Sequence, residues 1–221
     1  MEFFISSEIK EAVPSFQLGI ITYNDITVTN TPQWLQGRLQ LSLEEWLLEK
    51  ENVPTSEITG VQAWRKLFKL FGTDPSRYRP SHEALIRRLR KEKSLPSIHT
   101  AADVNNYFSI TIEAPMGIYN LDRLHGDITL RIGKADDHYM GINGREMAMA
   151  SKFLTADASG AFGSPIVDSK RSMVTEETRN ALHVIYFNPD LHRETAEKIL
   201  DQIGRSFIQF NGGEIRQSIL L

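Results

Sequence analysis

The 221-residue chain contains no cysteine and no long uncharged hydrophobic run. Without cysteine it has no thiolate nucleophile, no disulfide framework and no cysteine ligands for zinc or iron–sulfur clusters. The longest uncharged run near the start spans residues 12–24, which is shorter than the roughly 18 residues of a membrane-spanning helix. The first residues also lack the positively charged start of a signal peptide. We therefore expect a cytoplasmic protein with no membrane partner.

The motifs of several common chemistries are missing as well. No glycine-rich phosphate loop of a nucleotide hydrolase, no dinucleotide-binding glycine pattern and no glycine-flanked nucleophilic serine occurs in the sequence. The six histidines do not show the spacing of metal-binding pairs. We therefore expect neither a metal nor a cofactor.

The charge is unevenly distributed along the chain. The formal net charge is -3, whereas the segment from Arg65 to Lys93 holds ten basic and three acidic residues. Two interpretations stay open at this point. The basic residues either solvate helices, as lysine and arginine often do, or they meet a phosphate-bearing partner.

The first half of the sequence predicts two strands followed by helices. Residues 16–20 alternate in polarity, and we expect them to form a hairpin with residues 26–29 through a two-residue turn at Asn24-Asp25. Leucine recurs every four residues from Leu35 to Leu47, which indicates one helix or two, with a capping box at Ser42. Further helices are predicted over 61–71, from a cap at Ser81 through Leu89, and from a cap at Thr100 through Ile112.

The second half predicts mainly strands. Residues 128–132 alternate, and residues 181–187 are apolar on both faces, as in a central strand. A helix is expected from Asp190, followed by a short strand after Gly212-Gly213. Helices and strands without a regular strand–helix–strand alternation favour the α+β class and one packed unit.

Two groups of polar residues are candidates for a site. Asn106 and Ser109 lie three residues apart on one predicted helix and are expected to share a pocket, although helix solvation or local backbone bonding is the commoner role of such residues. The stretch from 160 to 172 combines glycines that let backbone approach a ligand with polar side chains, although a well-made turn has the same composition. Its members are Gly160, Gly163, Asp168, Ser169, Arg171 and Ser172.

Several local strings carry a family resemblance. They are Asp103-Val-Asn-Asn-Tyr107, Ala114-Pro-Met-Gly117, Leu121-Asp-Arg123, Gly126 to Arg131 and Ser172 to Asn180. With them the chain resembles the editing region, called B3/B4, of the bacterial phenylalanyl-tRNA synthetase β subunit, and specifically freestanding proteins built from that region. We interpret residues 1–221 as a single B3/B4-like domain, with a variable part over 1–73, a best-matching core over 74–189 and a C-terminal helix and strand over 190–221.

The resemblance implies a three-layer α+β fold, with a β-sandwich of unusual topology and flanking helices. It also implies a pocket that hydrolyses a wrongly attached amino acid from tRNA, with Asn106, Gly117, Thr178 and Asn180 at matching positions. The chain departs from the synthetase where Gly117 replaces a histidine, and where a glutamate near Lys170 is replaced by the earlier Asp168. The chain is too short to include the rest of a β subunit, so a complete tRNA ligase is not expected.

Three hypotheses follow. The first is an aminoacyl-tRNA deacylase with Asn106 and Asp168 as catalytic residues. The second is a non-catalytic module that binds RNA or a small amino-acid-like ligand. The third is an interaction protein that uses Trp34, Trp46 and the leucine repeat, although such residues are more often core. The expected pocket residues are Ser109, Gly117, Gly160, Gly163, Ser169, Arg171, Ser172, Thr178 and Asn180, and the expected RNA phosphate contacts are Arg79, Arg87, Arg88, Arg90, Lys91 and Lys93.

Overall fold

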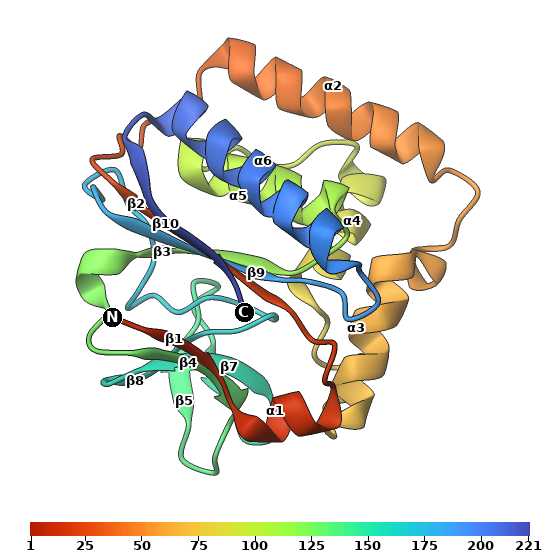
Figure 1. The fold of residues 1–221 in the computed structure, drawn as a ribbon. Helices are drawn as coiled ribbons and strands as arrows, with labels where there is room; N and C mark the ends of the chain where they lie inside the picture. Colours follow the sequence, from red (N-terminus) through yellow and green to blue (C-terminus); the bar gives the residue numbers. More distant parts are fainter.

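Two four-stranded sheets face each other in the computed structural model, which describes residues 1–221 (Figure 1). The first sheet has the order β10 (Glu214–Leu220), β2 (Leu18–Asn24), β9 (Ala181–Tyr186) and β3 (Met116–Asn120). The second has the order β1 (Phe3–Ile5), β4 (Ile128–Ile132), β7 (Phe153–Asp157) and β8 (Gly160–Gly163). A separate hairpin consists of β5 (His138–Met140) and β6 (Glu146–Ala148).

Two of the six helices pack on the outer face of the first sheet and give the fold a third layer, whereas residues of two others enter the core between the sheets. The helices are α1 (Ser7–Ala12), α2 (Gln33–Glu49), α3 (Thr59–Leu70), α4 (Ser81–Glu92), α5 (Thr100–Thr111) and α6 (Arg193–Asn211), with short 3-10 turns at Thr55–Glu57 and Leu121–Arg123. In Figure 1, α5 and α6 lie over the first sheet and α2 lies farther out. This arrangement confirms the predicted three-layer α+β fold. No helix has both the length and the hydrophobicity that crossing a bilayer requires.

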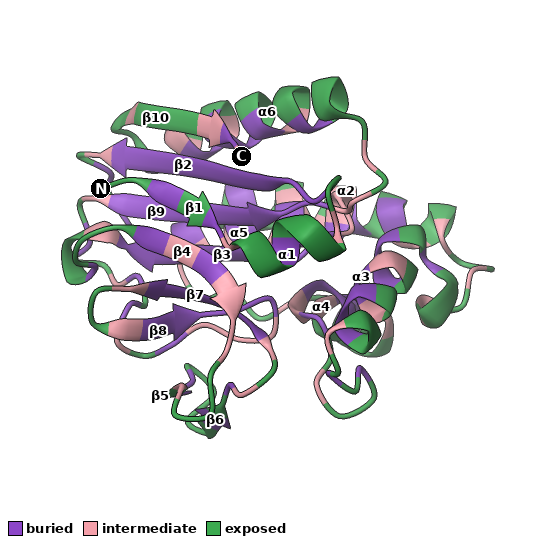
Figure 2. Ribbon diagram, turned by 60° about the horizontal axis from the view of Figure 1, so that its bottom comes forward, coloured by how far each residue is buried: buried purple, intermediate pink, exposed green.

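The core is divided by the first sheet. One cluster fills the space between the two sheets, with Leu18 and Val184 facing Leu130 and Phe162, and a second lies between that sheet and α5 and α6. Strands β2 and β9 are therefore buried on both faces, as Figure 2 shows, because each strand side meets an apolar layer. The prediction of a central strand at 181–187 is confirmed by the β9 pairing with both β2 and β3.

The basic segment forms α3 and α4, which pack together through a small apolar cluster that includes Val61, Ile86 and Leu89. At this contact Glu83 has no exposed side-chain surface and receives hydrogen bonds from Arg65 and Arg87. Part of the positive charge of the segment is thus neutralised inside the fold.

The predicted N-terminal hairpin is wrong. Asp25 adopts a left-handed backbone conformation at φ 54°, and the chain leaves the sheet there. Residues 26–29 form no strand; instead Ile26 and Val28 are buried in the helix-covered cluster. Strand β2 pairs with β9 and β10, both of which come from the far end of the sequence.

Several helix starts differ from the predictions. The residue before α4 is Pro80 rather than a capping Ser81, and α5 is capped by His99, whose ring accepts a hydrogen bond from the Ala102 backbone N–H. Helix α6 begins at Arg193, after a turn that starts at Asn188.

The leucine repeat forms a single helix, α2. Trp46 is buried, as expected for a core residue, whereas Trp34 is 62% exposed and lies against Phe210 of α6 at 6.2 Å between ring centroids.

Candidate functional site

A cavity of about 410 Å³ opens where α4 and α5 meet the loop that follows β8. Helix α4 and the segment after it form one wall, α5 and β3 the second, and the loop the third. The lining residues are Ser81, Ala84, Leu85, Arg88, Leu95, Pro96, Ile98, Asn105, Asn106, Met116, Ile142, Ser164, Ile166, Val167 and Asp168. We call this space the Asp168 cavity. It brings together the two predicted catalytic residues, Asn106 and Asp168.

Hydrogen bonds from neighbouring backbone and tyrosine hydroxyl groups, rather than a cation, hold Asp168 in the wall. Its backbone carbonyl accepts a hydrogen bond from Ile142 at 2.9 Å, and the preceding Val167 carbonyl accepts one from the Tyr139 hydroxyl at 2.6 Å. The carboxylate accepts a 2.5 Å hydrogen bond from the Tyr119 hydroxyl. No lysine or arginine forms an ion pair with it.

The ionisation of Asp168 is shifted toward neutral pH. Burial raises its pKa from 3.8 to about 7, and the hydrogen bond from Tyr119 partly opposes that shift. A carboxylate of this kind exchanges protons readily near pH 7, which is the range that suits a general base.

Two glycines predicted to line the pocket, Gly117 and Gly163, instead make room for Tyr119. A Cβ atom at Gly117 would lie 2.2 Å from the Tyr119 hydroxyl oxygen, and one at Gly163 would lie 2.3 Å from it. Gly117 and Tyr119 point to the same side of β3 because side chains alternate along a strand. Any side chain at either glycine position would therefore displace the tyrosine from Asp168.

Two amide side chains of α5 complete the polar wall. Asn105 donates a long hydrogen bond of 3.4 Å to the Asn106 side-chain oxygen. The buried Asn105 Oδ1 and the Ser81 hydroxyl of α4 have no hydrogen-bond partner in the protein. Buried polar atoms without partners are costly, so these two atoms are unsatisfied groups in the wall of the cavity.

The predicted pairing of Asn106 with Ser109 is wrong. Ser109 is fully buried, and its hydroxyl donates to the Ala114 carbonyl at 2.8 Å, where it fastens the end of α5. Residues three apart lie on one face of a helix. Along this face of α5, Asn106 lines the cavity, whereas Ser109 is buried in the core.

Arg171 also lies outside the cavity. It forms a two-pronged ion pair with Asp157, with nitrogen–oxygen distances of 2.9 and 3.2 Å, and donates to the Gly160 carbonyl. Gly160 lies in the β7–β8 turn at φ 106°, a backbone conformation that suits glycine.

The other predicted pocket residues have structural partners elsewhere. Ser169 and Ser172 are buried and hydrogen-bonded to each other at 2.9 Å. Thr178 accepts from the Thr175 backbone, and Asn180 donates to Asp122 at 2.8 Å. None of the four lines the Asp168 cavity.

The profile of the B3/4 domain family matches residues 63–202, which is more than half of the chain. The chain belongs to the B3/4 domain family. The match includes α4, α5, β3 and the loop that bears Asp168, and therefore every wall of the cavity.

The relatives of this B3/4 protein fall into two groups. An "Uncharacterized protein YhzB" of Bacillus subtilis (strain 168) is 26% identical over 217 residues, 96% of each chain. The phenylalanine–tRNA ligase beta subunits of Xanthomonas axonopodis pv. citri and Pectobacterium atrosepticum are 31% and 32% identical over 53% and 47% of this chain. These matches span only 15% and 14% of the beta subunits' own length.

A solved structure also resembles the B3/4 protein. It is an N-terminal fragment of the phenylalanyl-tRNA synthetase beta subunit from Pyrococcus horikoshii, with a TM-score of 0.48 and 13% sequence identity, covering 99% of this chain and 53% of that chain.

The predicted RNA-contacting residues of the B3/4 protein occupy different environments. Arg88 lines the Asp168 cavity and forms an exposed ion pair with Glu92 at 3.3 Å. Arg87 is bonded to the buried Glu83, and Arg90 donates to the Lys50 carbonyl. The remaining three predicted contacts are exposed, namely Arg79, Lys91 and Lys93.

Sequence reasoning missed two residues of the site, Tyr119 and Asn105. Tyr119 stands two residues after Gly117, a spacing that places both on one side of a strand, so the pair was a usable signal. Asn105 is adjacent to Asn106 in the matched string, but only the helix register shows that it also reaches the cavity. No group of three metal-ligating side chains in the chain is placed to share an ion.

Proposed function

We propose that this B3/4 protein hydrolyses the ester bond between an amino acid and the 3′ end of tRNA, with Asp168 as general base. One observation carries the proposal: a carboxylate with a pKa of about 7 and no cationic partner lines a cavity beside unpartnered polar groups. The phenylalanine–tRNA ligase beta subunits among its relatives support tRNA as the substrate.

Because an ester is already activated, the cavity needs only a general base and a group that stabilises the oxyanion, and no covalent nucleophile. The Asp168 carboxylate takes a proton from a water molecule as the water oxygen bonds to the ester carbonyl carbon. The side-chain N–H groups of Asn106 stabilise the negative charge that develops on the carbonyl oxygen. The bond between the ester carbonyl carbon and the ribose oxygen then breaks, and the proton passes from Asp168 to that oxygen, which leaves as the ribose hydroxyl.

The basic residues beside the cavity hold the RNA backbone in this scheme. Arg88 lines the cavity, and Lys91 is exposed on the same helix, α4. Because bound phosphates release counterions, tRNA affinity should fall as salt concentration rises. Affinity that does not respond to salt would contradict this part of the proposal.

The test is single-turnover release of labelled amino acid from a panel of correctly and wrongly charged tRNAs. We expect acceleration for at least one mischarged tRNA, and its loss in Asp168→Ala and Asn106→Ala. Asp201→Ala is the matched control, because Asp201 is an exposed aspartate of α6 paired only with Arg205. No acceleration by folded wild-type protein across the panel would overturn the proposal.

A second candidate function is a non-catalytic module that binds RNA or a small amino-acid-like ligand. The specific observation is that Tyr119 fills the space above Gly117, so a larger residue such as histidine does not fit there without moving the tyrosine. Saturable binding of a free amino acid or of uncharged tRNA, without turnover of any aminoacyl-tRNA, would favour this candidate.

A further inference from the structure

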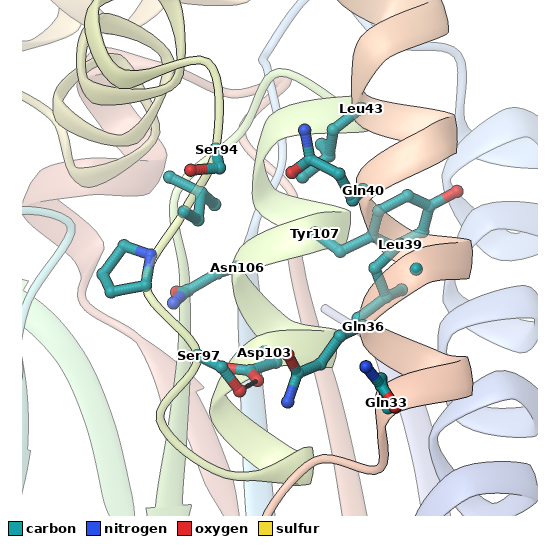
Figure 3. A pocket seen from close by; sticks show the side chains of 13 residues that line it. Gln33, Gln36, Leu39, Gln40, Leu43, Ser94, Ser97, Asp103, Asn106 and Tyr107 are labelled. Carbon is teal, nitrogen blue, oxygen red and sulfur yellow. Dashed lines mark hydrogen bonds between the residues drawn. The ribbon is translucent and has the colours of Figure 1, made fainter.

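A second cavity, of about 360 Å³, lies between α2 and α5 (Figure 3). We call it the glutamine cavity. It is separated from the Asp168 cavity by the segment that follows α4, and Leu95, Pro96 and Asn106 line both spaces. Its α2 wall lies outside residues 63–202, so this wall is an addition to the matched B3/4 region.

Four of the polar side chains that line the glutamine cavity are neutral amides. Gln33, Gln36 and Gln40 line it from one side of α2, as Figure 3 shows. The side-chain nitrogens of Gln36 and Gln40 donate to carbonyl groups of the protein, while their Oε1 atoms accept no hydrogen bond within it. No lysine or arginine lines the cavity, so it offers no counter-charge to an anion.

The single carboxylate of the cavity is already satisfied. Asp103 accepts hydrogen bonds from the Thr31 and Ser97 hydroxyls, each at 2.6 Å, and from the Ile98 backbone N–H at 2.9 Å. The half-buried ring of Tyr107 and the side chains of Leu39 and Leu43 supply apolar surface. The chemistry fits a flat, uncharged ligand with mixed donors and acceptors along its edge.

A glycine keeps the α2 wall open. Gly37 lies in the interior of the helix, where glycine is unfavourable, and it lines the cavity. A Cβ atom added there would meet no other atom within 4 Å, so packing against the protein does not require this glycine. A side chain at this position would project into the space that a ligand would use.

We infer that the glutamine cavity binds a nucleobase of the RNA whose esterified end occupies the Asp168 cavity. Single-stranded bases are recognised by stacking on aromatic rings and by hydrogen bonds to their edges, for which side-chain amides are well suited. The identity of the RNA rests on the proposed function, whereas base binding does not require catalysis.

The decisive variant is Gly37→Phe, which fills the glutamine cavity without touching Asp168. Leu41→Phe is the matched control, because it adds a ring at a 59% exposed site of the same helix that does not line the cavity. Binding of the four nucleosides and of dinucleoside monophosphates is measured by NMR titration of the full chain, and single-turnover deacylation is measured in parallel. Gly37→Met replaces the phenylalanine variant if that variant does not fold.

We expect at least one nucleoside or dinucleotide to bind the wild type and Leu41→Phe, with an affinity at least tenfold lower for Gly37→Phe. Failure of every probe to bind the wild type, or equal binding by Gly37→Phe, overturns the inference even if deacylation proceeds. Base binding that is lost in Gly37→Phe, in a protein that deacylates no tRNA, supports the inference and contradicts the proposed deacylase.

Discussion

Two aspartates on either side of strand β8 have opposite surroundings. Asp157, at the end of β7, has no exposed side-chain surface and is bonded to Arg171 and to the backbone N–H groups of His125 and Ser159. Burial opposes its ionisation, but these partners outweigh burial and lower its pKa. Asp168 follows β8 and has only the Tyr119 hydroxyl, so burial prevails and its pKa rises to about 7.

The comparison shows that the partners of a buried carboxylate, more than its burial, determine its pKa. They therefore decide whether the residue has a structural role or can act as an acid or base. Asp157 is permanently charged at neutral pH and closes the β7–β8 turn together with Arg171. Asp168 can take up and release a proton at neutral pH and lines a cavity. Variants that remove the charge of either aspartate, or the hydroxyl that contacts Asp168, test this contrast.

The largest effect is expected from Asp168→Asn. If Asp168 is the general base, single-turnover deacylation should fall by about 100-fold. Stability should not fall in this variant. Because the pKa of Asp168 is raised to about 7 in the folded protein, the carboxylate increasingly destabilises the fold as pH rises from 3.8 to 7, and the destabilisation is complete above pH 7. Urea unfolding at pH 8 should therefore give an unchanged or higher free energy of unfolding. A variant that unfolds more easily at pH 8 and retains activity would reverse the roles we assign.

Asp157→Asn should show the opposite pattern. It leaves Arg171 without its anion and should lower the free energy of unfolding by about 2 kcal/mol at pH 7, less than for a fully buried pair because Arg171 is 33% exposed. The stability difference between wild type and variant should shrink below pH 3.8. There the unfolded wild-type chain takes up a proton at Asp157, so the charge of the folded aspartate contributes less and less to wild-type stability. In the folded fraction, deacylation should stay near the wild-type rate. A 100-fold loss of rate without loss of stability would break the comparison.

Tyr119→Phe should have the smallest effect and should sharpen the account of Asp168. Removing the hydroxyl removes the one hydrogen bond that holds the Asp168 pKa down, so the pKa should rise further. The rate should then increase with pH over a higher range than in the wild type, with a several-fold loss at pH 7 that recovers at higher pH. The check is the pH profile of deacylation, corrected for spontaneous hydrolysis at each pH. A midpoint that moves downward would show that Tyr119 acts in another way.

The sequence predicted the elements with strong local periodicity. The helices over residues 61–71 and 100–112 and the strands over 128–132 and 181–187 are present within a few residues. It did not predict the partners of β2, because pairing with β9 and β10 joins segments far apart in the chain. The parallel pairing of β1 with β4 was missed for the same reason.

The site was predictable in part. Asp168 and Asn106 came from local strings, and both line the cavity. Arg171 was grouped with Asp168 because the two are near in sequence, yet the tight turn between them points the arginine toward Asp157. Gly163 indicated close approach correctly, but the approaching group is the Tyr119 side chain rather than a ligand, and only the spacing of Gly117 and Tyr119 along one strand pointed to it.

The contrast between the two aspartates can be measured without any substrate. Carbon-13 NMR titration of the aspartate carboxyl groups, assigned with Asp168→Asn and Asp157→Asn, reports each ionisation in the folded protein. The account predicts that Asp168 titrates near pH 7 and that Asp157 titrates below the ordinary aspartate range. A titration of Asp168 at or below pH 4 would contradict the central claim that this cavity holds a carboxylate ready to accept a proton at neutral pH.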